Sequence, residues 1–223
     1  MTKKVFCILC IFIILVNCST LSAGGLKSEK IEGIIGRQLE IDNFRVNTEL
    51  EIRAFAGQSS RFEFTYYYQK PDKVHLESRD FVLLPREAVR TLQPDFFNPE
   101  RYNYSYLRVE KECQLFEFIP VDDEEKYRLI LWIEPEGAQI KHAEIFFMMG
   151  NYQEEFAVQI DYEQIEGYSL PVYVEGKVAV PTKFGMGGEI KETTEGSFIL
   201  NLRNYRINRA FPRSIEKILN DLA

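Results

Sequence analysis

The chain has 223 residues, a formal net charge of −7 and an aromatic content of 13%. This acidic balance argues against nucleic acids and anionic membrane surfaces as partners, because both are bound by clustered lysine and arginine. The length provides for one domain with a sizeable core, and the aromatic content excludes a disordered chain.

The first 23 residues have the pattern of an export signal. Lys3 and Lys4 precede an unbroken apolar block from Val5 to Val16, and a short stretch of mainly small and polar residues ends at Ala23. The block is too short to span a bilayer, which takes about 20 apolar residues. We therefore expect an exported protein of the periplasm or cell envelope.

Two ways of processing this signal stay open. Cleavage after Ala23 would release residues 24–223, which we expect to form a single domain. Alternatively, Leu15-Val16-Asn17-Cys18 resembles a bacterial lipoprotein signal, in which residues 1–17 are removed and Cys18 is lipidated. Asn17 stands where such signals usually have a small residue.

The first predicted element after the signal is a helix over residues 26–39. Its apolar residues recur at helical spacing: Ile31, Ile34, Ile35 and Leu39. Gly33 and Gly36 each weaken a helix by about 1 kcal/mol. Such a helix is held by what it packs against, or its backbone must approach something closely.

From residue 44 onward the apolar residues recur at every second position, the period of a β-strand. Turn-forming residues separate these runs, and most of them have no helical pattern between them. The sequence therefore predicts an antiparallel sheet with one apolar face and excludes a parallel α/β sheet. The alternating apolar sets are Phe62, Phe64, Tyr66 and Tyr68; Leu107 and Val109; Tyr127, Leu129, Leu131 and Ile133; Phe156, Val158, Ile160 and Tyr162; and Phe198, Leu200 and Leu202.

Two segments depart from the strand pattern. Residues 86–104 are expected to be irregular, opening with a short helix. The tail from Pro212 to Ala223 has helical spacing, and proline is favoured at the start of a helix. Its apolar residues are Ile215, Ile218, Leu219 and Leu222.

The sequence offers no motif for catalysis, a metal or a cofactor. His75 and His142 each stand alone on a predicted strand, and Asp122-Asp123-Glu124-Glu125 lacks the alternating ligands of a calcium loop. The glycines between Gly185 and Gly188 do not precede a Lys-Ser or Lys-Thr pair. Cys113 is the single cysteine outside the signal region, and we interpret it as a buried strand residue. We expect a protein that is not an enzyme and needs no cofactor.

Three stretches of the chain resemble a known family. The expected helix leads into Phe62-Glu63-Phe64 and a strand end at Tyr68-Gln69-Lys70-Pro71-Asp72-Lys73-Val74. The middle contains Gly167-Tyr168-Ser169-Leu170-Pro171, and the end runs from Asn204 to Phe211-Pro212 and Ile215. Together, over most of residues 28–216, they resemble the outer-membrane lipoprotein carrier (LolA-like) superfamily.

This resemblance implies an α+β fold: a strongly curved antiparallel sheet forming an unclosed half-barrel, plugged by the N-terminal helix and short lid helices. It implies binding and transport of lipid or lipoprotein acyl chains, with membrane-bound donor or acceptor proteins as partners. Lys70 stands where the carrier has an arginine thought to gate its cavity. Residues 86–104 stand in place of a hairpin that usually contains Asp-Gly.

We expect a monomer whose concave face binds an acyl chain, with Ile31, Ile34 and Ile35 on the lid and Lys70 at the mouth. Each lining residue can also be an ordinary core residue, since an apolar strand face must be buried in any case. The predicted lining is Phe62, Phe64, Tyr66, Leu129, Leu131, Phe156, Val158 and Ile160. The alternative is an interaction or envelope-stress sensor module without transport. It would present an exposed aromatic patch made of Phe96, Phe97, Tyr102, Tyr104 and Tyr106.

Overall fold

The computed structural model describes residues 28–54, 59–79, 86–122, 127–149, 153–184 and 190–221. The predictions for the export signal and for Cys18 lie outside these residues, as does the glycine turn at 185–188.

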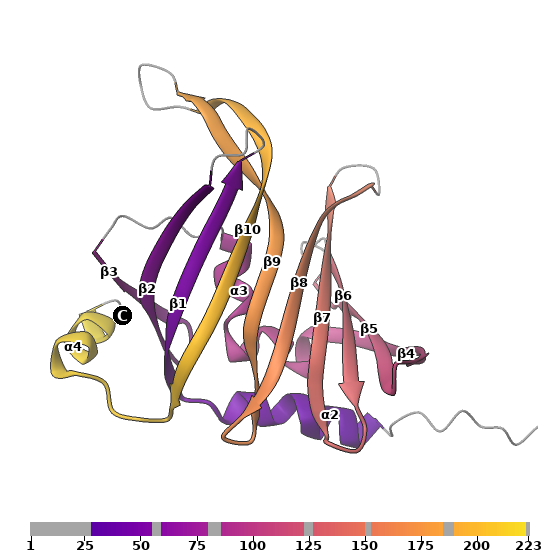
Figure 1. The fold of residues 1–223 in the computed structure, drawn as a ribbon. Helices are drawn as coiled ribbons and strands as arrows, with labels where there is room; N and C mark the ends of the chain where they lie inside the picture. Colours follow the sequence, from indigo (N-terminus) through magenta and orange to yellow (C-terminus); the bar gives the residue numbers. More distant parts are fainter. Residues whose placement is uncertain are drawn as a thin grey trace, which may run out of the picture.

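Ten strands form one antiparallel sheet, in the order β3-β2-β1-β10-β9-β8-β7-β6-β5-β4. The sheet bends strongly, and its first and last strands do not pair (Figure 1). This arrangement confirms the predicted unclosed half-barrel. The strands are β1 Asn43–Ala54, β2 Ser59–Gln69, β3 Lys73–Ser78, β4 Tyr102–Glu110, β5 Cys113–Pro120, β6 Tyr127–Glu134, β7 Gln139–Met149, β8 Gln153–Ile165, β9 Tyr168–Phe184 and β10 Ile190–Ile207.

The predicted alternation decides which side chains enter the concave interior. In β6, every second residue from Tyr127 to Ile133 is buried and the residues between them are half-buried. The register then places inward residues of neighbouring strands together, as with Leu129 opposite Phe118 and Leu131 opposite Phe116. The two-residue period therefore builds a continuous apolar inner surface.

The helical segments lie inside the curve of the sheet, with one exception. Figure 1 shows α2 across one end of the strands and α3 behind the sheet, whereas α4 lies beside β3. The predicted helix at 26–39 is a regular α-helix only to Gly36 and continues as a 3₁₀ turn. Residues 86–101 contain a short helix and two 3₁₀ turns and no strand, as predicted, but the strand β4 begins at Tyr102, three residues earlier than expected. The helical segments are α2 Ser28–Gly36, η1 Arg37–Glu40, α3 Arg86–Thr91, η2 Pro94–Phe97, η3 Pro99–Arg101 and α4 Arg213–Asp221.

The C-terminal helix α4 packs on the outer face of the sheet. Its residues Ile215 and Leu219 are buried against Tyr67, which alternates with the inward Tyr66 and Tyr68. The predicted helix is thus present, but Ile218 is 39% exposed rather than part of the buried stripe. Among the helices in the described part of the chain, none combines the length and the apolar character that crossing a membrane requires.

The prediction for the edge strand β4 is wrong in one respect. Leu107 and Val109 alternate with charged residues, but both are exposed, Val109 by 60%. The pairing of β4 with β5 shifts between Tyr106 and Arg108, so the alternation of faces is interrupted there. β4 is the last strand of the sheet, and among the described elements no further strand or helix covers these side chains.

Candidate functional site

The structure gathers the predicted lining residues into one interior. Six of the eight belong to a single apolar cluster that reaches from β2 across the sheet to β6. Phe62 is half-buried at the border of this cluster, and the side chain of Phe156 lies outside the described residues. The fully enclosed members of the predicted set are Phe64, Tyr66, Leu129, Leu131, Val158 and Ile160.

The lid residues pack into this same interior. Ile31, Ile34 and Ile35 on α2 are each at most 5% exposed and belong to the apolar cluster of the sheet. The interior is therefore closed in this structure, and side chains of the protein itself occupy the space expected for a ligand. The described residues of the predicted lining are core residues in this structure, apart from the half-buried Phe62.

Packing, not close backbone approach, holds the glycine-bearing helix. A Cβ placed on Gly33 or Gly36 would meet no atom within 4 Å, so neither glycine is required by a crowded neighbour. Burying three isoleucines contributes about 5–9 kcal/mol, whereas two glycines cost about 2 kcal/mol. The burial therefore outweighs the weak helix propensity, and the helix is held by what it packs against.

A few hydrogen bonds join the lid to the rim of the sheet. Lys70 Nζ donates to the Leu39 carbonyl at 2.9 Å, and the Tyr104 hydroxyl donates to Glu32 Oε1 at 2.8 Å. With the Gln38 side-chain amide in its hydrogen-bonding orientation, its nitrogen donates to the Ser169 carbonyl at 3.0 Å and its oxygen accepts from the Ser169 N–H at 3.2 Å. Each such bond contributes about 1 kcal/mol net, because the exposed groups can form hydrogen bonds with water instead.

Lys70, the predicted mouth residue, lies at the junction of η1 and the sheet. Its ammonium lies on the last turn of η1, where the carbonyl groups of a helix end have no intrahelical partner. Lysine offers a single flexible point charge there, whereas the planar fork of arginine can hold two acceptors at once. The contact is accordingly a weak one, exposed to solvent.

The segment η2 forms a second cover, made of aromatic side chains. The Phe96 ring is stacked on Tyr127 with centroids 5.9 Å apart, and Phe97 meets Tyr162 edge-on at the same distance. The Tyr102 hydroxyl donates to the Phe96 carbonyl at 2.6 Å, which fixes the backbone of the segment.

This arrangement overturns the exposed aromatic patch that the alternative function required. Phe96, Phe97 and Tyr102 are buried, Tyr104 is half-buried, and Tyr106 alone of the five is exposed. The physical reason is the open side of the half-barrel, which can be kept from water only if neighbouring loops turn their apolar side chains inward.

Sequence reasoning missed the tyrosine hydroxyls that line the interior. Tyr102 and Tyr127 share a hydrogen bond of 2.8 Å, and the Tyr205 hydroxyl donates to the Pro171 carbonyl at 2.6 Å. Burial raises the pKa of Tyr102 and of Tyr205 above the ordinary value, so both stay neutral donors. The available signal was tyrosine at the inward positions of several alternating strands.

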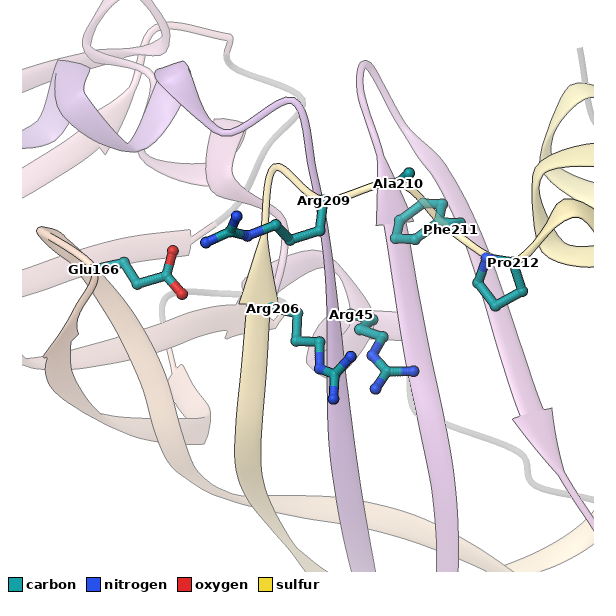
Figure 2. A pocket seen from close by; sticks show the side chains of 7 residues that line it. All are labelled: Arg45, Glu166, Arg206, Arg209, Ala210, Phe211 and Pro212. Carbon is teal, nitrogen blue, oxygen red and sulfur yellow. The ribbon is translucent and has the colours of Figure 1, made fainter.

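A pocket of about 520 Å³ lies on the outer face, where three arginines gather (Figure 2). Arg45 and Arg206 are directly opposite in the β1–β10 ladder, and their side chains project together beside Arg209. Among the described residues, no carboxylate lies within salt-bridge distance of these three, although Glu166 also lines the pocket. Such a group of guanidinium donors suits an anion such as phosphate.

The described residues contain no group of three or more His, Cys, Asp or Glu side chains that could hold a metal ion. His142 Nδ1 lies 2.6 Å from Asp161 Oδ1, and its ring meets Trp132 edge-on, which is a structural arrangement on the sheet surface. Burial raises the pKa of the Cys113 thiol, which makes a reactive thiolate less available.

No protein-family model matches this sequence, and no curated protein matches it either. Solved structures do resemble it. A putative outer-membrane lipoprotein-sorting domain from Vibrio parahaemolyticus has a TM-score of 0.54 at 13% identity, covering 86% of this chain and 99% of the other. A LolA superfamily protein from Nitrosomonas europaea has a TM-score of 0.52 at 14% identity, covering 87% and 98%.

A protein of the DUF1329 family from Desulfovibrio piger is similar to the same degree, with a TM-score of 0.52 at 11% identity and coverage of 86% and 98%. Identities this low establish a common fold and nothing finer. The sequence resemblance is confirmed at that level: this chain has the half-barrel fold of the LolA superfamily and of lipoprotein-sorting domains.

Proposed function

We propose that the protein binds the acyl chain of a lipid or lipoprotein in its interior and carries it across an aqueous compartment, without catalysis. One observation carries this proposal: the segments that cover the interior, α2 and η2, are built independently of the sheet. The ten strands pair with one another without any contribution from α2 or η2. Both covers can therefore leave without breaking a strand, and they would uncover a continuous apolar surface.

The energies favour an exchange between lid and ligand. The three lid isoleucines contribute about 5–9 kcal/mol of burial, and a dozen methylene groups of an acyl chain contribute about 10 kcal/mol. A bilayer offers the chain nearly the same environment. A protein whose own lid competes with the ligand thus releases its cargo readily, as a shuttle must.

The comparisons support the compartment and the type of cargo. The Vibrio parahaemolyticus domain carries the description of lipoprotein sorting at the outer membrane, and the first 23 residues of this chain have the pattern of an export signal. We infer an extracytoplasmic monomer that meets membrane-bound donor or acceptor proteins at the ends of its route.

A second candidate, a protein-interaction module, has one observation in its favour. The edge strand β4, the end of β5 and the residue that follows it expose several large apolar side chains: Tyr106, Leu107, Val109, Ile119 and Val121. Exposed apolar groups at a sheet edge suit contact with another protein. This surface differs from the acyl-binding interior, so the two functions can be tested separately.

The proposal is tested with protein isolated from the cell envelope under mild conditions. Native mass spectrometry should detect a bound lipid in 1:1 ratio, and a fluorescent fatty acyl probe should compete for the same site. Val109→Ser, on the exposed edge of β4, is the matched control and should leave the bound lipid in place. Protein that carries no lipid and binds no probe would contradict the carrier function. If instead the wild type co-purifies with a partner protein and Val109→Ser does not, the interaction module would be favoured.

A further inference from the structure

Positive charge gathers at the end of β10 and in the loop that follows it. Residues 203–213 contain four arginines and no acidic residue, in a chain whose net charge is −7. The four are Arg203, Arg206, Arg209 and Arg213. Two of them, Arg206 and Arg209, line the outer-face pocket together with Arg45. Charge of one sign is thus concentrated beside a hollow on an otherwise acidic molecule.

An irregularity in β10 turns Arg206 to the outer face. Strict alternation after the inward Leu202 would direct Arg206 inward and Tyr205 outward. Instead Tyr205 is buried in the apolar cluster and Arg206 is exposed. The pairing of β10 with β1 is shifted at this point, and Asn204 has a left-handed φ of 62°. Such bulges re-aim side chains and are frequent beside functional sites.

Arg45 and Arg206 lie within reach of one small ligand. They are directly opposite in the antiparallel ladder, a placement in which the Cβ atoms are about 4.5–5.5 Å apart. Figure 2 shows the two side chains running in the same direction from their strands. Arg45 interacts as well with the Tyr67 hydroxyl, and its several N–H donors leave others for a ligand. Like charges in this position destabilise the sheet, and an anion between them would remove the repulsion.

The third arginine of the pocket is held by an anchored loop. Before it, Asn208 has a φ of 49°, and its Oδ1 accepts from two backbone N–H groups at the start of β1, at 2.9 and 3.3 Å. After it, the Phe211 ring meets Tyr67 edge-on, with centroids 5.4 Å apart. Arg209 therefore stands between two fixed points, which lowers the cost of ordering its side chain around a ligand.

The lining of the pocket indicates the class of ligand. Its described ionisable residues are the three arginines and Glu166, with a net charge of +2. A phosphate monoester carries about −1.5 to −2 at neutral pH, and guanidinium forks match its oxygen atoms. Phe211 and Pro212 add an apolar wall for an attached organic group, and about 520 Å³ is the size of a small-molecule site. The acidic surface elsewhere disfavours a long polyanion.

We propose that this pocket binds the terminal phosphate of a phosphate monoester. Arg45 and Arg206 donate to the phosphate oxygens as a pair, and Arg209 closes a further side. A lipid headgroup with a terminal phosphate and a soluble phosphate ester present the same chemistry. Because these arginines lie on the outer face of the sheet, the inference goes beyond the acyl-binding function and does not depend on it.

Calorimetric titration of the purified protein with inorganic phosphate and glycerol 3-phosphate tests the site. Both should bind saturably in 1:1 ratio, and Arg206→Gln should weaken the binding roughly 10- to 150-fold. Its Tm without ligand should stay the same or rise, because a like-charged neighbour is removed. Arg79→Gln is the matched control: Arg79 is exposed and does not line this pocket, so the same loss of charge should change the affinity less than about 2-fold.

Vesicles distinguish the two sources of the phosphate. They contain nine parts phosphatidylcholine to one part phosphatidic acid, with phosphatidylcholine alone as the reference. Binding to the mixed vesicles alone, lost in Arg206→Gln, would support the proposal and assign a lipid headgroup. Binding of glycerol 3-phosphate without vesicle binding would support it and assign a soluble ester.

Three results would overturn the proposal. One is the absence of saturable binding to every phosphate probe. Another is an equal loss of affinity in Arg79→Gln and Arg206→Gln, which would show unspecific attraction by charge. The third is tighter binding of a hexaglutamate peptide than of glycerol 3-phosphate, which would identify the arginines as a contact for an acidic protein segment.

Discussion

The glycine at the centre of the lid provides a sharp test, because it can be changed without touching the interior. Gly33 is exposed on α2, and a Cβ added there meets no atom within 4 Å. Gly33→Ala should therefore stabilise α2 by about 0.5–1 kcal/mol through helix propensity alone. If a ligand must wait for the lid to open, the same free energy opposes binding, and apparent affinity should fall roughly 2- to 5-fold.

The assay for Gly33→Ala combines two readings, hydrogen exchange along α2 and displacement of a fluorescent acyl probe. The exchange rate of the α2 amides should decrease by about the same factor as the apparent affinity. Asn220→Ala is the matched control, because Asn220 is an exposed residue of the outer helix α4; it should stabilise α4 without changing affinity. An affinity that stays constant or increases while α2 exchange slows would refute the opening of the lid as the step that admits the ligand.

Three further predictions follow from packing, charge and burial. Ile35→Ala truncates a fully buried lid residue and should destabilise the closed form by about 2–4 kcal/mol, seen as faster α2 exchange and tighter acyl binding; weaker binding would contradict the lid role. Arg206→Glu turns the like-charged pair of Arg206 and Arg45 into an oppositely charged one and should raise the free energy of unfolding by about 0.2–1 kcal/mol, seen as a higher urea midpoint; a lower midpoint would disprove the repulsion. Because burial raises the pKa of the inner tyrosines above the unfolded value of about 10, the folded state keeps protons that the unfolded chain releases. The stability that these tyrosines contribute should therefore be constant well below pH 10 and be lost as the pH rises past it, so that alkaline unfolding releases an added step of phenolate absorbance at 295 nm; ionisation of the inner tyrosines in folded protein near pH 10 would contradict their burial. These tyrosines are Tyr66, Tyr102, Tyr162 and Tyr205.

Sequence period was sufficient to predict the inner surface of the sheet and the buried side of the lid. The alternation in β2 and β6 has a local cause, since successive strand residues must face opposite sides. The isoleucines of α2 follow the helical period for the same kind of reason. Both predictions needed no knowledge of which strands are neighbours.

Features that depend on distant parts of the chain could not be predicted in this way. Tyr67 lies on the outer face and alternates with inward residues, yet it is buried because α4 returns from the C-terminus to cover it. Phe96 and Phe97 belong to a segment without a period, so the sequence left their direction undetermined. The curvature of the sheet decides it, and curvature arises from the sum of all ten strands.

Only part of the candidate site was accessible from the sequence. The family resemblance led us to expect Lys70 at the mouth of the cavity, whereas its hydrogen bond to the Leu39 carbonyl is visible only in the structure. The pairing of Tyr102 with Tyr127 joins strands β4 and β6, which are not adjacent in the sheet. Which hydroxyls are paired and which are not therefore becomes visible only once the sheet is folded.

In the proposed carrier, an acyl chain replaces the lid in the interior while the sheet stays intact. Hydrogen exchange measured with and without saturating methyl laurate distinguishes the lid from the sheet. We expect faster exchange in α2, η1 and η2 on binding, together with unchanged or slower exchange in β6 and β8. Unchanged exchange in the lid at saturating ligand, or faster exchange throughout the sheet, would contradict it.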